Sequence, residues 1–241
     1  MILWFRNDLR THDNPALHHF LNTPSSNDSR KAIFFISEPQ WQIHDWSDIK
    51  IDLIIRHAKA LVSELARLDI TLELVHVTDF SAQIEYLKAY CLQHNTERVF
   101  ANSELEYNEQ QRDLSCIEQG IPLSLFEADV IVPKGRVLNQ SGTMFKVFTP
   151  FKKAWLKHVK QFGFEYLGKV DHKTTIDAEL DLMRDAGNSI SSAWPLACDY
   201  ERNALSTFFQ DKIMSYAKHR DIPSIKGTSG ISPYLAAGLV S

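Results

Sequence analysis

The chain has no glycine before Gly120, although its 241 residues include nine. A dinucleotide-binding turn needs G-x-G-x-x-G directly after the first strand, and a P-loop needs G-x-x-x-x-G-K-S/T. Neither pattern occurs, and no G-x-S-x-G elbow is present to hold a nucleophilic serine. The sequence therefore disfavours an ordinary NAD enzyme, a P-loop NTPase and an elbow-type serine hydrolase.

Cysteine is also scarce, and long apolar runs are missing. Cys91, Cys116 and Cys198 share no C-x-x-C spacing, and no secretory segment opens the chain, so we expect reduced thiols in a cytoplasmic protein. No run approaches the roughly 18 apolar residues that span a bilayer, so no membrane partner is expected. Ten histidines occur without H-E-x-x-H or a Cys/His quartet, and we therefore expect no metal site.

Basic side chains are too few for a nucleic-acid-binding surface over the whole chain. Thirty Asp and Glu outnumber 26 Lys and Arg, which gives a net charge of -4 at pH 7, so any contact with nucleic acid must be local. Hydrophobic residues make up 44 % and charged residues 23 % of the chain, as in globular proteins with a core. The length allows one large domain, or one domain and part of another.

Short apolar runs alternate with segments of helical spacing. Runs of strand length lie at residues 2–5, 32–36, 72–77, 98–101 and 123–127. Between them, the clearest helical face repeats at i, i+3 and i+4 from Ile51 to Leu68. This order predicts an α/β fold: a five-stranded parallel Rossmann-like sheet with helices on both faces and a ligand crevice at the carboxyl ends of the strands.

Two local patterns predict helix starts. Asn14 followed by Pro15 is typical of an N-cap with proline at the first helical position. Ser103 and Glu106 have the spacing of a capping box, ahead of a segment that ends at Gly120.

The pattern changes after Asp129, where we expect the sheet domain, residues 1–129, to end. Residues 130–195 are predicted to be a connector, because residues 168–194 are polar and keep no sustained period. Residues 196–241 are predicted to begin a helical domain, and an apolar helix still in progress at Ser241 predicts a truncated protein. The helical face expected there consists of Ala204, Leu205, Phe208, Phe209 and Ile213.

Residues 216–241 are the richest in candidate ligand-binding groups. The run GTSG at 227–230 places two hydroxyls between two glycines ahead of a helix, and such a loop offers amides and hydroxyls to an anion or phosphate. A plain turn is the alternative, with Ser232 as the N-cap and Pro233 at the first helical position. Spacing alone leaves both interpretations open.

Three sequence blocks together carry a resemblance to a known family. WFRNDLRTHDNPAL at 4–17, FKVFTPFKKAW at 145–155 and RDIPSIKGTSGISPYL at 220–235 resemble the photolyase/cryptochrome family, in particular the bacterial cyclobutane pyrimidine dimer photolyases. The blocks occur in family order and span nearly the whole chain. Family members are considerably longer. The resemblance implies that this chain covers an α/β antenna-binding domain, a connector and the beginning of a helical FAD-binding domain.

The resemblance implies an FAD site near the end of the chain. In the family, a tyrosine twelve positions before a Thr-Ser pair helps to bind FAD, and the pair and the next three residues contact its phosphates. The matching positions are Tyr216, Thr228, Ser229, Gly230, Ile231 and Ser232. Some bacterial relatives have arginine in place of Gly230, so binding there must rest on backbone amides and hydroxyls.

The resemblance also implies an antenna pigment, 5,10-methenyltetrahydrofolate. Family members bind it with a histidine after the second strand and an Asn-Glu pair near the start of a helix, and His44, Asn108 and Glu109 match these positions. Trp41 and Trp46 flank the histidine as stacking faces. An amide and a carboxylate can pair with the hydrogen-bonding edge of a pterin. Without the resemblance, the three residues would be a surface histidine and two solvated helix residues.

Other charged and aromatic residues favour structural roles. Arg6, Asp8, Arg10 and Asp13 are expected to pair locally and fix the loop after the first strand. Trp155 is expected in the core. Four lysines at helical spacing are expected on a solvated helix face. They are Lys152, Lys153, Lys157 and Lys160.

The function that the resemblance implies is light-driven DNA repair, by a carbon–carbon lyase. The folate absorbs light and passes the energy to reduced FAD, which donates an electron to a flipped-out pyrimidine dimer, so no side chain is expected to be a catalyst. Ultraviolet-damaged DNA is the expected partner, through the helical domain, and a monomer is expected. Two alternatives stay open: a cryptochrome-type blue-light receptor, and a stand-alone nucleotide-binding α/β module.

Overall fold

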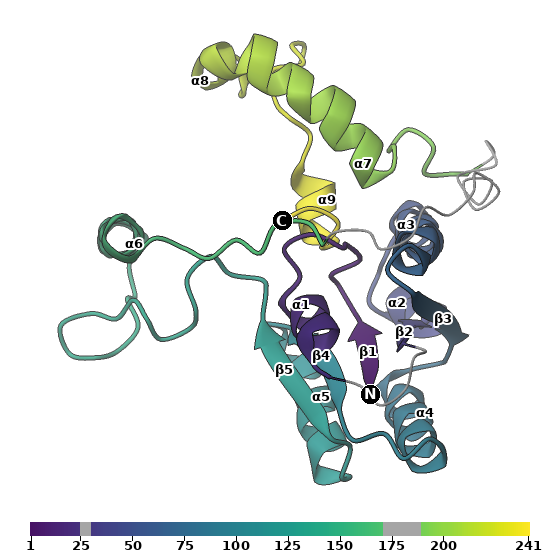
Figure 1. Ribbon diagram of the computed structural model, residues 1–241. Coiled ribbons are helices and arrows are strands. Elements are labelled where there is room, and N and C mark those ends of the chain that lie inside the picture. The colour runs from purple at the N-terminus through teal and green to yellow at the C-terminus, as the bar shows by residue number, and fades with distance from the viewer. Residues whose placement is uncertain (25–29, 171–188) are drawn as a thin grey trace.

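The computed structural model describes residues 1–24, 30–170 and 189–241, and its centre is a five-stranded parallel sheet (Figure 1). The strand order is β3-β2-β1-β4-β5, so the chain moves outward from β1 first on one side and then on the other. The predicted parallel sheet is confirmed. Its strands are β1 (Ile2–Phe5), β2 (Arg30–Ile36), β3 (Ile70–His76), β4 (Val99–Ser103) and β5 (Leu123–Glu127).

Helices cover both faces of the sheet, which explains why the central strand β1 is apolar from end to end (Figure 1). Leu3 and Phe5 of β1 belong to one buried cluster, with residues of α1 (Pro15–Asn22) and α3 (Asp48–Ala66). Ile2 and Trp4 belong to a second cluster, with residues of α4 (Phe80–Gln93) and α5 (Tyr107–Glu118). Alternate side chains of one strand therefore fill two cores.

The two predicted helix starts have different outcomes. Asn14 caps α1, and its side chain accepts a hydrogen bond from the Leu17 amide at 3.1 Å, as the sequence predicts. The capping box of Ser103 and Glu106 is wrong. Ser103 is the last residue of β4, and its Oγ donates to the Phe126 carbonyl at 3.2 Å, so pairing with β5 takes the hydroxyl that the cap would need.

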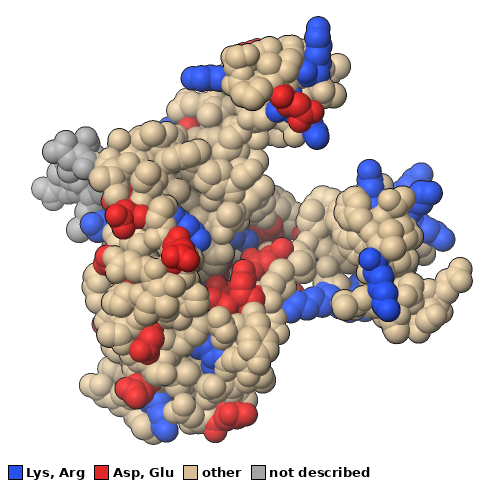
Figure 2. All heavy atoms as spheres, turned by 180° about the vertical axis from the view of Figure 1, so that it is seen from behind, with Lys and Arg blue, Asp and Glu red and all other residues tan. Residues whose placement is uncertain are grey.

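Helix α6 (Phe148–Phe162) extends away from the sheet and buries none of its residues (Figure 1). The four lysines on it are exposed, as expected, and the α6 region shows blue side chains in Figure 2. Trp155 is only half-buried, so its expected place in the core is wrong. No other described element packs over α6 to bury that indole.

The C-terminal region forms a helical rod above the sheet (Figure 1). It consists of α7 (Ala197–Tyr200), π-helical turns at Glu201–Leu205 and Phe208–Lys212, a 3₁₀ turn at Ile213–Ser215 and α8 (Tyr216–His219). Phe208 of the expected helical face is buried, whereas Phe209 and Ile213 are exposed. The chain then returns to the sheet through α9 (Ser232–Ala236). The expected continuation of this helix to Ser241 is wrong, because Gly238 has a φ of +61° and cannot extend it.

The loop after β1 joins distant parts of the chain. Arg6 donates its backbone N–H to Asp8 Oδ1 at 2.6 Å, which is the local contact expected. The side chains reach further, since Arg6 pairs with Asp113 and Arg10 donates to the Gly238 carbonyl at 3.0 Å. The expectation of local pairing is therefore only partly correct.

Most of the connector expected at residues 168–194 lies outside the described residues. Across residues 1–24, 30–170 and 189–241, no helix combines the length and apolar character needed to cross a membrane.

Candidate ligand-binding site

A cavity of about 380 Å³ lies at the carboxyl ends of β1, β2 and β4, next to the point where the strand order reverses. His44, Asn108 and Glu109 all line it. His44 is the residue that ends α2 (Glu38–Ile43), and the other two lie in the first turn of α5. The parallel sheet thus brings these three predicted residues to one cavity.

Buried arginines border this cavity and are neutralised by carboxylates. Arg6 Nη1 donates to Asp113 Oδ2 at 2.8 Å, and Arg112 Nη2 donates to Glu104 Oε2 at 2.6 Å and to Asp113 Oδ1 at 3.1 Å. Both guanidinium groups also lie over the ring of Trp4, at 3.9 and 4.6 Å from its centroid. Burial lowers the pKa of Arg6, and repulsion by Arg112 adds to this effect. The charges therefore depend on Asp113 and Glu104 for compensation.

Aromatic rings and a lysine form another part of the lining. Trp41 and Trp46 stack on each other, with centroids 5.2 Å apart and planes inclined by 13°. Lys50 Nζ lies 3.3 Å from the centroid of Trp46. The two indoles line the cavity, as expected, but each covers one face of the other. Trp41 and Lys50 therefore cover the ring of Trp46, and a flat ligand meets indole edges and the other face of Trp41.

Two buried amide oxygens in the lining have no hydrogen-bond partner among the described residues. They are Oε1 of Gln40 and Oε1 of Gln83, whose Nε2 donates to Ser37 Oγ at 3.0 Å. A buried acceptor without a donor is costly to the fold. Burial raises the pKa of Glu109. This donor and acceptor set fits the amide-like edge of a pterin. Neither glutamine, nor Lys50, belongs to a spacing that the sequence marks as a site.

The residues matched to FAD phosphate binding lie on an exposed segment rather than in a closed cavity. Thr228, Gly230 and Ser232 are exposed, and the Ser229 carbonyl accepts a hydrogen bond from the Tyr200 hydroxyl at 3.0 Å. None of the six predicted FAD residues lines the 380 Å³ cavity, and none lines a second, larger cavity described below. A flavin site can be accessible here, but the described residues do not enclose one.

Close packing nevertheless brings this segment back to α8, which starts at Tyr216. A Cβ added to Gly227 would lie 2.6 Å from the His219 Cβ, so the glycine permits the contact. Tyr216 is 37 % exposed, and its ring packs against that of Phe208 in a T-shaped arrangement, with the ring centroids 5.9 Å apart. The residue that caps α9 is Ile231, so the alternative with Ser232 as N-cap is wrong, although Pro233 does lie in the first turn.

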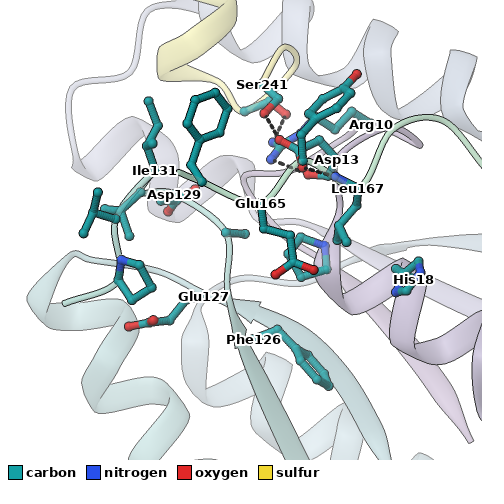
Figure 3. A pocket seen from close by; sticks show the side chains of 18 of the residues that line it. Arg10, Asp13, His18, Phe126, Glu127, Asp129, Ile131, Glu165, Leu167 and Ser241 are labelled. Carbon is teal, nitrogen blue, oxygen red and sulfur yellow. Dashed lines mark hydrogen bonds between the residues drawn. The ribbon is translucent and has the colours of Figure 1, made fainter. Parts of the chain in front are cut away.

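The second cavity, of about 890 Å³, has no counterpart among the sequence predictions. It lies between α1, the segment after β5 and the segment after α6 (Figure 3). Asp13 links two of the segments that line this cavity. Its Oδ1 accepts a hydrogen bond from the Leu167 amide at 3.1 Å, and its Oδ2 accepts one from the Ser241 hydroxyl. Partial burial and repulsion from Asp8 raise the pKa of Asp129 to about 6. Figure 2 shows acidic side chains gathered in the hollow beside the α6 arm.

Comparisons with known proteins agree on one family. The family model described as DNA photolyase matches residues 1–171. The deoxyribodipyrimidine photo-lyase of Vibrio cholerae is 36 % identical over 253 residues, which cover 100 % of this chain and 53 % of the relative. The protein of that name from Escherichia coli is 32 % identical, with 100 % and 52 % covered. The chain therefore spans about half the length of the curated relatives it matches.

Solved structures share the fold at lower identity. A cryptochrome from Synechocystis superposes with a TM-score of 0.73 at 18 % identity, covering 100 % of this chain and 53 % of that one. An archaeal photolyase from Sulfolobus tokodaii, solved with two FAD molecules, gives 0.68 at 19 % identity, with 100 % and 52 % covered. At these identities the likeness concerns the fold alone.

Proposed function

The chain belongs to the DNA photolyase family, and we propose that it is part of a light-driven enzyme that splits cyclobutane pyrimidine dimers in ultraviolet-damaged DNA. The names of its relatives support a lyase of this kind, at up to 36 % identity over the whole chain. One structural observation supports the antenna part most directly. The histidine, asparagine and glutamate matched to folate binding all line one cavity.

The proposed cofactors are FAD and 5,10-methenyltetrahydrofolate. The chain contributes Tyr216 and the segment from Thr228 to Ser232, with Ser229, Gly230 and Ile231, to FAD; the folate site consists of His44, Asn108 and Glu109. When bound, the folate supplies light absorption and the reduced flavin supplies the electron for repair. The protein's own part is to bind and orient both pigments and to exclude water around them.

We also propose that the chain consists of three successive parts. Residues 1–129 form the antenna-binding domain, residues 130–195 the connector, and residues 196–241 the beginning of the helical FAD-binding domain. The proposed protein is a cytoplasmic monomer that meets damaged DNA through its helical domain. Its exposed lysines on α6 are solvated rather than part of the pigment sites.

A repair assay on the whole protein tests the proposed function. We expect light to restore intact pyrimidines in an oligonucleotide with one cyclobutane thymine dimer, measured by chromatography, when the protein carries reduced FAD. Samples kept in the dark should show no repair, and the 241-residue segment by itself should show negligible repair, because its described residues enclose no flavin cavity. If the whole protein binds FAD but leaves every dimer intact under light, the repair function is wrong, and the blue-light receptor is favoured.

Alanine at Asn108 or Glu109 tests the antenna site. We expect each variant to weaken folate binding about tenfold, because each loses one hydrogen bond to the pterin in a partly desolvated cavity. Repair with externally reduced flavin should stay nearly unchanged. The measurement is folate retained after gel filtration, read from its absorbance.

Two exposed residues on the same helix serve as matched controls. Gln111→Ala and Glu118→Ala remove the same side-chain types, and neither position lines the cavity. Both should retain folate as the unsubstituted protein does. Full retention in Asn108→Ala and Glu109→Ala would show that the folate lies elsewhere.

A further inference from the structure

Lys50 carries a partly desolvated charge in the wall of the 380 Å³ cavity. Its side chain is half-buried, and its Nζ lies against the face of Trp46, 3.3 Å from the ring centroid. Burial lowers its pKa, and the charge of Glu106 opposes this effect. Among the described residues, no carboxylate forms an ion pair with Lys50. The ammonium group has therefore lost part of its hydration, and among the described residues Glu106 acts on it without forming an ion pair.

The other cations of the cavity differ in this respect. Arg6 is paired with Asp113, and Arg112 with both Asp113 and Glu104. Glu106, the acidic residue that acts on Lys50, accepts a hydrogen bond from the Leu105 amide at 3.0 Å. A partly desolvated cation that forms no ion pair favours an incoming anion, because the anion replaces the lost hydration.

Resting on the folate site proposed above, we propose that Lys50 binds a carboxylate of the glutamyl tail and so makes the cavity selective for anionic, tail-bearing pterins. Lys50 projects from the first turn of α3, whereas Asn108 and Glu109 project from α5. Lys50 and the Asn108–Glu109 pair thus reach the cavity from two different helices. Trp46 positions the ammonium group through the cation–π contact.

The test compares two ligands of nearly equal size that differ in charge. They are 5,10-methenyltetrahydrofolate and its derivative with both glutamate carboxylates converted to amides. Binding to the whole protein is measured by calorimetry and by pigment absorbance, at low and high salt. We expect Lys50→Met to weaken binding of the folate about tenfold and of the diamide less than twofold. Lys50→Arg should restore folate binding, and salt should weaken binding to the unsubstituted protein only for the folate.

Lys59→Met is the matched control, because Lys59 is exposed on the same helix and does not line the cavity. It should bind both ligands as the unsubstituted protein does. Equal folate binding by Lys50→Met would overturn the proposal, and so would an equal loss for both ligands, which would mean that Lys50 only supports the cavity. If the unsubstituted protein binds neither ligand, the folate site itself is wrong, a result distinct from the other two.

Discussion

Replacing Asp113 by alanine is expected to lower the free energy of unfolding by about 3–5 kcal/mol, because it leaves buried charge without compensation. Asp113 is 4 % exposed and accepts hydrogen bonds from Arg6 at 2.8 Å and from Arg112 at 3.1 Å. Arg112 would keep Glu104, but Arg6 would lose its carboxylate, and two of the Arg6 nitrogens already have no partner among the described residues. Urea unfolding followed by circular dichroism measures the change.

An exposed ion pair provides the control for this variant. Arg220 and Asp221 lie 3.3 Å apart with side chains that are 52 % and 81 % exposed, so Asp221→Ala should change stability by less than about 0.5 kcal/mol. Asp113→Asn keeps the acceptor oxygen and should fall between the two. A loss below about 1 kcal/mol in Asp113→Ala would show that the arginines do not need this carboxylate.

The sheet could be predicted because its central strands β1 and β4 are almost wholly buried. All four residues of β1 are buried, so the run from Ile2 to Phe5 is apolar from end to end and its bounds are those of the strand. Parallel order followed from the helical segments between the runs, since each crossover needs one. The position of each strand and the helix that follows it are both set by nearby residues, so the local sequence predicts them.

The wrong predictions share a different cause. Ser103 has the spacing of a helix cap, yet pairing of β4 with β5 extends the strand through it. Trp155 is a large apolar residue of the kind found in cores, but its burial depends on a neighbouring element. No described helix or strand covers α6. In both cases tertiary contacts decide what local chemistry leaves open.

The candidate site divides in the same way. His44, Asn108 and Glu109 could be named because short motifs matched a family, and the sheet topology then places all three at one edge. Other lining residues come from separate elements: Gln83 from α4, far along the chain from His44, and Lys50 from the start of the next helix, α3. No spacing in the sequence encodes these long-range contacts.

The loop after β1 links this cavity to the segment proposed to bind FAD. Asn7 lines the cavity, and its Nδ2 donates to the Ala236 carbonyl at the end of α9 at 3.2 Å. Arg10 donates to the Gly238 carbonyl at 3.0 Å. The same short loop thus fixes both proposed pigment sites, and a change at this junction should disturb the FAD segment more than the antenna cavity.

Gly238→Ala tests that junction and is expected to destabilise the docked C-terminal segment by about 2–5 kcal/mol. The added Cβ would lie 1.6 Å from the Asn7 carbonyl oxygen, and the residue has a φ of +61°. Because neither the backbone of the loop nor that of Gly238 can move without breaking the contacts to Arg10 and Asn7, α9 should separate from the sheet. Hydrogen exchange at Tyr234, which is fully buried, should then rise, and FAD binding by the whole protein should weaken at least tenfold.

Gly142→Ala separates steric overlap from backbone strain. Gly142 has a φ of +71°, and a Cβ there would meet nothing within 4 Å, so this variant bears the cost of the left-handed conformation alone, about 1–2 kcal/mol. It should leave exchange at Tyr234 and FAD binding unchanged. Of these two glycines, Gly238 alone combines that conformation with contact to the loop after β1. Equal effects of the two substitutions would therefore mean that this loop does not hold α9 in place.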